Sequence, residues 1–222
     1  MFTCLLLFTL AFLFRYSEYL NYKQLEGPLL FTSTIGAGSD QDSQTKCAQD
    51  FVLSKHTTTT YITHPDYLIM CPYMGYVIEK FGFVKGLEFL MYSTMIMGAL
   101  VAVVPFILLS YLHKRFSIGG LFASLVLIVN QLLIYDSSGR FMIYPLSSLF
   151  FTFMYIFFFL ALYQKKLTWL IGLGITAGIN GLNKPFFLFN DIPLLALFSI
   201  IYLVSDFKRK KIFPFFNIKV SL

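Results

Sequence analysis

Two aspartates, Asp40 and Asp42, stand one residue apart in the longest polar segment of the chain and are its sharpest candidates for chemistry. Carboxylates at this spacing can share a divalent cation such as Mg²⁺ or Mn²⁺, or one can act as a general base while the other orients it. The structural alternative is a helix N-terminus, where aspartate caps free amide groups and complements the helix dipole. Taken alone, the spacing favours that structural alternative.

Three basic residues are candidates for binding a substrate: His64, Arg140 and Lys184. Arg140 and Lys184 lie beside the ends of apolar runs, where a guanidinium or an ammonium group can bind a phosphate. Snorkelling of these two side chains at a membrane interface is the simpler alternative. His64 could assist a bound acceptor or cap the turn before Pro65. Asp191 lies inside an apolar run and is assigned no role.

The chain carries no sequence signature of a zinc site, a P-loop or a catalytic serine. Four glycines fall between residues 172 and 181, in an apolar run without a strand before it, and predict close packing between membrane helices rather than a nucleotide site. Cys4 lies in an apolar run and cannot easily pair. Cys47 and Cys71 share the polar segment, where a disulfide is permitted. Two free, buried thiols are nevertheless the favoured interpretation.

Composition places these residues in a membrane protein. Of the 222 residues, 57% are apolar and 13% are charged, whereas a soluble domain has about 45–50% apolar and about 25% charged residues. The mean hydropathy is +0.72. These values exclude a soluble globular domain, a disordered chain and a disulfide scaffold. The net charge of +6 does not indicate a nucleic-acid partner, because the cations form short clusters between apolar runs.

The apolar runs predict an all-α, multi-pass bundle of about six transmembrane helices, since a helix needs roughly 20 residues to span the bilayer. The runs cover residues 2–14, 89–112, 118–135, 141–163, 167–182 and 185–204. The first run stops at Arg15 and is short for a span. A signal-peptide core is the alternative, but a basic leader and a nearby cleavage site are missing. A short or truncated transmembrane helix is therefore favoured.

Loop charges set the predicted orientation. Basic clusters at 113–115, 165–166 and 208–211 follow the second, fourth and sixth runs, and the positive-inside rule assigns them to the cytoplasm. Five helices instead of six would keep these loop charges but move the N-terminus outside. The predicted organisation is a first transmembrane helix at 1–14, an extracytoplasmic loop at 15–87, a five-helix region at 88–207 and a basic cytoplasmic tail at 208–222.

The long first loop is predicted to carry two amphipathic helices. Residues 40–55 can form the first, and residues 66–83 can form the second. The second offers apolar and aromatic side chains that can lie on the membrane surface. These are Leu68, Ile69, Tyr73, Tyr76, Val77 and Phe81.

Several short pieces of the sequence follow one another in a particular order. They are the pair Asp40 and Ala48, the turn His64-Pro65 with an amphipathic segment that ends at Gly82, the opening Tyr144-Pro145-Leu146-Ser147 of an apolar run, and the glycine-rich stretch 172–185 with its Lys184. In this order they resemble the GT-C superfamily of membrane glycosyltransferases, in its protein O-mannosyltransferase and aminoarabinose transferase branch. The resemblance covers roughly residues 39–206. The chain departs from it at Gln41, Gln44 and Asp66, which replace an acid, an aromatic residue and a proline.

The resemblance implies transfer of a sugar from a polyprenyl-phosphate donor to an acceptor on the outer or lumenal face of a bacterial cell membrane or an endoplasmic reticulum membrane. It implies that Asp40, with Asp42, supplies the base and a possible divalent-cation site. Arg140 and Lys184 would bind the carrier phosphate, and His64 would assist the acceptor. Because members of this superfamily are usually longer, it also implies further C-terminal helices or a partner subunit.

A non-enzymatic membrane protein, such as a transporter or an assembly subunit, is the alternative function. Transporters usually bury polar residues near the middle of the membrane. In this sequence the apolar runs are nearly free of charge and the acids gather in the first loop. That distribution favours the enzyme.

Overall fold

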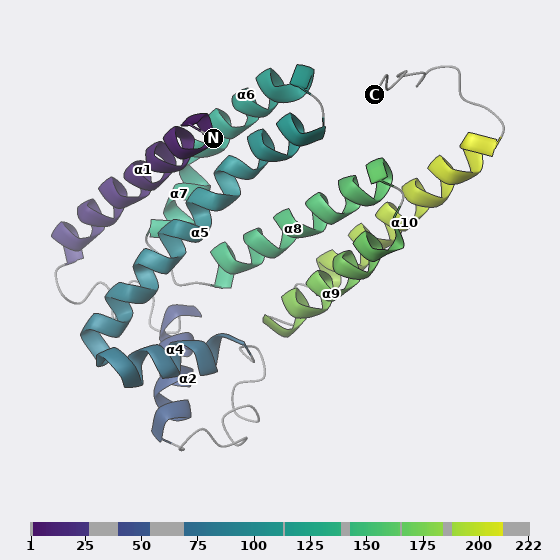
Figure 1. Ribbon diagram of the computed structural model, residues 1–222. Coiled ribbons are helices and arrows are strands. Elements are labelled where there is room, and N and C mark those ends of the chain that lie inside the picture. Colours follow the sequence, from purple (N-terminus) through teal and green to yellow (C-terminus); the bar gives the residue numbers. More distant parts are fainter. Residues whose placement is uncertain are drawn as a thin grey trace.

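The computed structural model describes residues 2–26, 40–53, 69–112, 114–138, 143–164, 166–183 and 188–210 (Figure 1). Within these ranges the chain is all-helical and contains no strand, so the predicted all-α class is confirmed there. The elements are α1 (Phe2–Glu26), α2 (Asp40–Leu53), α4 (Met70–Phe81), α5 (Phe83–Leu112), the short 3₁₀ helix η3 (Lys114–Phe116), α6 (Ser117–Ile128), α7 (Gln131–Ser138), α8 (Ile143–Gln164), α9 (Leu167–Asn183) and α10 (Leu188–Lys210).

Three of the described helices are long and apolar enough to cross a membrane. The stretches concerned are Phe2–Asn21 in α1, Phe83–Leu112 in α5 and Pro145–Gln164 in α8. Helix α6 and the part Asp191–Val204 of α10 are apolar but shorter. By length and composition, the three long helices indicate a membrane protein.

Helix α1 does not end where the apolar run ends. The sequence suggests a first helix of 14 residues, but α1 continues through Arg15 to Glu26. The physical reason is that Arg15 does not face solvent: it is fully buried, and its Nη1 donates a hydrogen bond of 2.9 Å to the carbonyl oxygen of Ala11. The charge is taken into the bundle, so it does not terminate the helix.

The apolar run 118–135 forms two helices rather than one. Helix α6 ends at Ile128, and α7 begins at Gln131. Between them the side-chain Oδ1 of Asn130 accepts a hydrogen bond of 2.9 Å from the backbone amide of Leu133. Asparagine is among the preferred residues for capping a helix N-terminus in this way. A polar cap within the run therefore starts a new helix, α7, which packs against α1 and α5.

Helix α5 is the centre of the fold, because it contacts α1, α4, α6, α7 and α8. One buried apolar cluster joins α2 and α4 to α1 and the first half of α5, and a second joins α1, the second half of α5 and α6. A third joins α8, α9 and α10, where the rings of Phe158 and Phe198 stack with their centroids 4.0 Å apart. Large apolar side chains also face outward, among them Phe122 and Leu203. This is the surface expected of helices surrounded by lipid.

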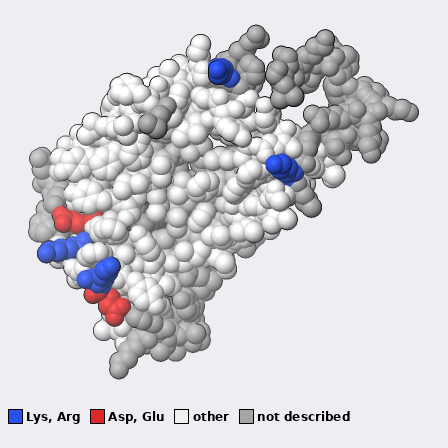
Figure 2. Space-filling view, in the orientation of Figure 1, with Lys and Arg blue, Asp and Glu red and all other residues white. Residues whose placement is uncertain are grey.

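The two ends of the helix bundle carry different kinds of charged side chains. Figure 1 shows the C-terminal ends of α5, α8 and α10 at one end of the bundle, with α2 and α4 at the other. On the face drawn in Figure 2, acidic and basic side chains gather together at the lower left, whereas isolated basic side chains lie toward the upper right. On this face, no charged side chain of the described residues is visible in the band between them. Such a band between two polar ends is the pattern of a protein that crosses a bilayer.

Candidate functional site

The structure describes the scaffold of the predicted acidic site. Helix α2 begins at Asp40, so Asp40 and Asp42 stand in its first turn, as the predicted helix over 40–55 requires. The side chains of both aspartates lie outside the described residues, as do His64, Arg140 and Lys184. Among the side chains that are described, no three His, Cys, Asp or Glu residues are grouped so that they could hold a metal ion. The roles of these five residues stay predictions.

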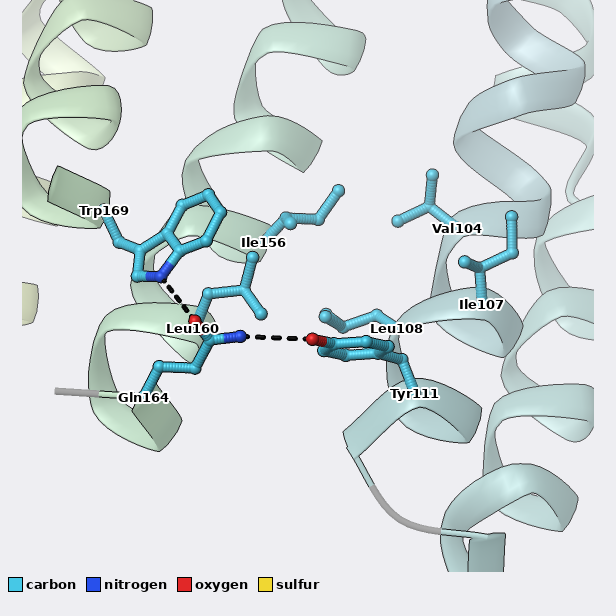
Figure 3. A pocket seen from close by; sticks show the side chains of 8 residues that line it. All are labelled: Val104, Ile107, Leu108, Tyr111, Ile156, Leu160, Gln164 and Trp169. Carbon is cyan, nitrogen blue, oxygen red and sulfur yellow. Dashed lines mark hydrogen bonds between the residues drawn. The ribbon is translucent and has the colours of Figure 1, made fainter. Parts of the chain in front are cut away.

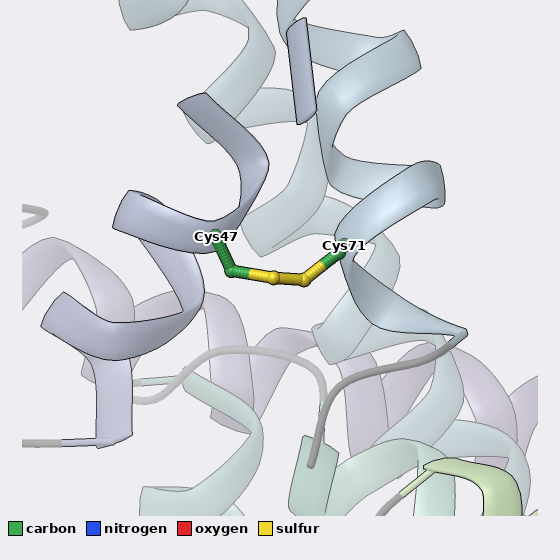
Figure 4. Close-up of a disulfide and its surroundings, with 2 residues drawn as sticks. All are labelled: Cys47 and Cys71. Carbon is green, nitrogen blue, oxygen red and sulfur yellow. A yellow bond between two sulfur atoms is a disulfide. The ribbon is translucent and has the colours of Figure 1, made fainter. Parts of the chain in front are cut away.

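A disulfide ties α2 to α4. Cys47 and Cys71 are bonded, with their Cα atoms 5.5 Å apart (Figure 4), so the expectation of two free thiols was wrong. The reason lies in small residues that let the two helices approach closely. A Cβ added at Gly75 of α4 would lie only 2.6 Å from the ring of Phe51 and 3.3 Å from the carbonyl oxygen of Ala48, both on α2. This separation of the helices suits disulfide geometry.

A glycine turn fixes this helix pair on the start of α5. Helix α4 ends at Phe81, two residues before the end of the amphipathic helix predicted over 66–83, and Gly82 has a φ of 79°. Only glycine adopts that left-handed conformation at little cost. Gly86 follows in the first turn of α5, donates a backbone hydrogen bond of 2.8 Å to Gly82, and lies against Ile78 of α4. Helix α2 is thus joined through α4 to the start of α5.

The outer face of α4 is aromatic. Tyr73, Tyr76 and Phe81 are exposed, in agreement with the predicted surface-lying face. Val77 was assigned to the same face but is buried against α2 and α5, because it lies on the side of the helix that carries Met70 and Met74. Aromatic side chains on a short helix next to a span are typical of a membrane interface.

A buried polar network joins α8, α9 and α10. Ser147 Oγ donates to Asn180 Oδ1 at 2.7 Å, and Asn180 Nδ2 donates to the two carboxylate oxygens of Asp191 at 3.0 and 3.2 Å. All three residues are buried, and Asp191 lies in the first turn of α10, where the helix dipole favours a negative charge. The sequence left Asp191 unassigned. The available signal was an acidic residue inside an apolar run, but the network that receives it is completed by Asn180 of α9 and Ser147 of α8.

A second buried polar group surrounds Arg15, between α1, α5 and α7. Besides Nη1, the guanidinium has two nitrogens, Nε and Nη2, that are buried and find no hydrogen-bond partner among the described residues. Gly98 and Ser137 lie against it. The hydroxyl of Thr94 donates to the carbonyl oxygen of Ser137 at 3.1 Å and so ties α5 to α7 beside it. Sequence reasoning missed this group, because Arg15 was taken as the end of a helix.

The close approach at Gly98 yields a testable prediction. Gly98→Ala is expected to destabilise the protein by about 1–3 kcal/mol through overpacking. The added Cβ would lie 2.6 Å from Arg15 Nε and 2.5 Å from Ser137 Cβ. Reversible unfolding of the purified protein in detergent measures the change.

Gly174→Ala in α9 is the matched control. Apart from the backbone of α9 itself and the adjacent residues, no described atom lies within 4 Å of a Cβ at Gly174 or at Gly178, so the predicted close packing of the glycine-rich helix is absent at these two positions within the described chain. Gly172 alone of the glycines measured in α9 meets a neighbour, the ring of Phe157 at 3.4 Å. Alanine at 174 should leave stability unchanged or slightly raised. Equal stability of the two variants would contradict the tight contact at Gly98.

Comparisons of the chain with protein-family models, with curated proteins and with solved structures find no match. Function must therefore be argued from the residues and the geometry.

Proposed function

We propose that the chain crosses the membrane six times, through α1, α5, α6 with α7, α8, α9 and α10. In this arrangement α2 and α4 lie outside the membrane, and the loops after α5 and α8 lie in the cytoplasm with the basic end of α10. The support is that the helix ends next to the three basic clusters lie at one end of the bundle, opposite to α2 and α4 (Figure 1). The positive-inside rule gives this end to the cytoplasm.

We propose further that the protein is a membrane glycosyltransferase of the GT-C type, which uses a sugar linked to a polyprenyl phosphate. The observation that carries this proposal is the fixed position of the start of α2. The disulfide to α4 and the Gly82 turn attach this helix to the end of the bundle that the proposed topology assigns to the outside of the membrane. An extracytoplasmic carboxylate above a set of membrane helices is what transfer from a lipid carrier to a soluble acceptor requires.

In the proposed reaction, Asp40 removes the proton from an acceptor hydroxyl, and Asp42 orients Asp40 or shares a divalent cation with it. The acceptor oxygen forms a bond to the anomeric carbon as the bond from that carbon to the phosphate oxygen breaks. The carrier phosphate leaves with an added negative charge, which Arg140 and Lys184 stabilise. His64 assists the acceptor. Further C-terminal helices or a partner subunit complete the proposed enzyme.

The direct test is an assay with the purified protein in vesicles, a radiolabelled polyprenyl-phosphate sugar and a mixture of hydroxyl acceptors. If polyprenyl phosphate is released only when the protein is present, the result supports sugar transfer to an acceptor, or hydrolysis of the donor with water in place of the acceptor. Absence of release and of donor binding, in a preparation that unfolds cooperatively, would remove the enzyme from consideration.

The second candidate is a non-enzymatic protein such as a transporter, and the buried Arg15 is the observation that favours it. Arg15 lies within the span of α1 against Gly98, near the middle of α5, and two of its nitrogens have no described partner. Ionisable groups inside a membrane span mark substrate or ion pathways in many transporters. Two results together would favour this candidate. The parent protein would take up a substrate but show no sugar transfer, and the Arg15→Met variant would no longer take up that substrate.

The proposed orientation predicts a difference between two exposed lysines. Lys85 lies at the α4 end of α5, and Lys166 lies between α8 and α9 at the opposite end. In a Cys4→Ser background, a cysteine at 85 should react with an impermeant maleimide in intact cells. A cysteine at 166 should react only after the membrane is opened. If only the cysteine at 166 is labelled in intact cells, the true topology is the inverse of the proposed one.

A further inference from the structure

An apolar pocket lies between α5 on one side and α8 with α9 on the other. Its volume is about 340 Å³. Val104 projects into it from α5, and Ile156 and Leu160 project from α8 (Figure 3). At its edge Tyr111 is exposed by 62% of its surface, so the pocket is open to the surroundings of the helices. In a membrane protein those surroundings are lipid chains.

A chain of three hydrogen-bonded side chains borders one end of this pocket. Trp169 Nε1 donates to Gln164 Oε1 at 3.1 Å, and Gln164 Nε2 donates to the hydroxyl oxygen of Tyr111 at 3.1 Å (Figure 3). The chain connects α9, α8 and α5. Tyrosine and tryptophan with such polar contacts are enriched where the hydrocarbon region meets the headgroups. The polar border therefore marks the headgroup side of the pocket.

Two exposed lysines stand just beyond this border. Lys166 lies in the turn before α9, and its carbonyl oxygen accepts a hydrogen bond of 3.2 Å from the backbone amide of Trp169. Lys114 follows closely after Tyr111, and its carbonyl oxygen accepts a hydrogen bond of 2.6 Å from the hydroxyl of Ser117. These contacts fix both turns next to the pocket residues. Both lysine side chains are exposed, three residues after Tyr111 and two residues after Gln164 of the polar border.

The stretches of sequence that carry these two lysines contain no acidic residue. After Glu88 the next acidic residue is Asp136, and after Asp136 the next is Asp191. Both lysines fall within these acid-free stretches, as do the neighbouring basic residues His113, Arg115 and Lys165. An apolar pocket with a cationic rim is complementary to a molecule that has an apolar chain and an anionic head.

We propose that this pocket binds one acyl chain of an anionic membrane phospholipid, and that the positive charge of Lys114 and Lys166 attracts its anionic headgroup. The lipid belongs to the leaflet on the side of the basic loops. The inference requires that the protein is inserted in a membrane, but it is independent of glycosyl transfer and of the extracytoplasmic acidic residues. Failure of the transferase assay would leave it intact.

The test is lipid binding to the full chain, measured by native mass spectrometry of the detergent-purified protein. The probes are dioleoyl phosphatidylglycerol, dioleoyl phosphatidylcholine and water-soluble glycerol phosphate. Phosphatidylglycerol is expected to bind more tightly than phosphatidylcholine. Since each lysine near a membrane surface is worth about fivefold in affinity for an anionic lipid, the double variant Lys114→Gln with Lys166→Gln should lose most of that difference. Lys80→Gln with Lys85→Gln, at the opposite end, should lose none.

The pocket itself is tested by filling it. Val104→Phe places a ring in the space for the acyl chain and is expected to weaken binding of both lipids by tenfold or more. Val126→Phe is its control, because Val126 lies exposed on α6, away from the pocket. Each variant must unfold at the temperature of the parent protein in detergent alone.

Three outcomes would overturn the proposal. The first is equal affinity for the two lipids in the parent protein. The second is phosphatidylglycerol binding that survives both Val104→Phe and the double lysine variant in preparations of normal stability. The third is displacement of the lipid by glycerol phosphate at equal concentration, since the affinity would then come from the phosphate without the acyl chain.

Discussion

Asp40→Asn is expected to lower the rate of sugar transfer by about 10²–10⁴-fold while the protein stays inserted and folded. This is the usual loss when a general base is removed, because the amide cannot accept the proton of the acceptor hydroxyl. Asp42→Asn is expected to lower the rate as well, through loss of the group that orients the base or shares a cation with it. The measurement is the initial rate of donor turnover in the vesicle assay, at saturating donor.

The choice of asparagine separates catalysis from helix capping. Asparagine caps a helix N-terminus about as well as aspartate, whereas alanine costs about 1 kcal/mol. If Asp40 serves only as a cap, Asp40→Asn should be silent in both rate and stability, and Asp40→Ala should lower stability. If it is the base, Asp40→Asn should lower the rate at unchanged stability.

Asp50→Asn provides a matched control, since it makes the same change on α2 outside the predicted acidic pair. It is expected to leave the rate within a few-fold of the parent. Full activity of both Asp40→Asn and Asp42→Asn would end the assignment of this pair. Loss of activity in all three variants would instead point to a general sensitivity of α2.

The apolar runs of the sequence predicted three helices well, because burial of apolar residues is the main factor that sets the extent of these helices. The runs 141–163 and 167–182 correspond to α8 and α9 with small shifts of their ends, and the run 89–112 corresponds to α5, which begins earlier, at Phe83. In these elements the local pattern and the final packing agree, which is the condition under which sequence patterns are informative.

The differences arise where a polar residue acts through a tertiary contact. Arg15 was expected to end a helix, because an exposed charge does not continue an apolar span, but the structure buries it against Gly98. Asn130 was counted as part of one run, yet its side chain caps a new helix. In both cases the outcome depends on neighbouring helices, and an apolar run does not reveal what packs beside it.

The buried polar network could not be predicted for a related reason. Ser147, Asn180 and Asp191 come from three helices, and their hydrogen bonds depend on how those helices cross. Each residue had a visible sequence signal, but no spacing rule connects them. The disulfide is similar, since the sequence allowed a bond between Cys47 and Cys71 without fixing the distance between α2 and α4.

Loss of that disulfide is expected to destabilise the α2–α4 unit by about 3–4 kcal/mol, because the bond closes a chain segment with a sequence separation of 24 residues. Cys47→Ser, Cys71→Ser and reduction of the parent protein should have similar effects. Hydrogen exchange measures the result: amides of α2 should exchange about 10²-fold faster or more, whereas those of α8 and α9 should change little. Cys4→Ser is the control, since Cys4 is a free cysteine on α1.

The same variants connect the scaffold to the proposed chemistry. If the start of α2 supplies the base, a loosened α2–α4 unit places Asp40 and Asp42 less accurately, and misplaced groups lose much of their catalytic effect. Transfer by Cys47→Ser should therefore fall in parallel with the protection of α2, and oxidation of the reduced parent protein should restore both. Faster exchange in α2 with an unchanged transfer rate would separate the acidic helix from catalysis. Unchanged exchange after reduction would show that the buried contacts of Ala48, Met70 and Met74 hold the two helices together without the bond.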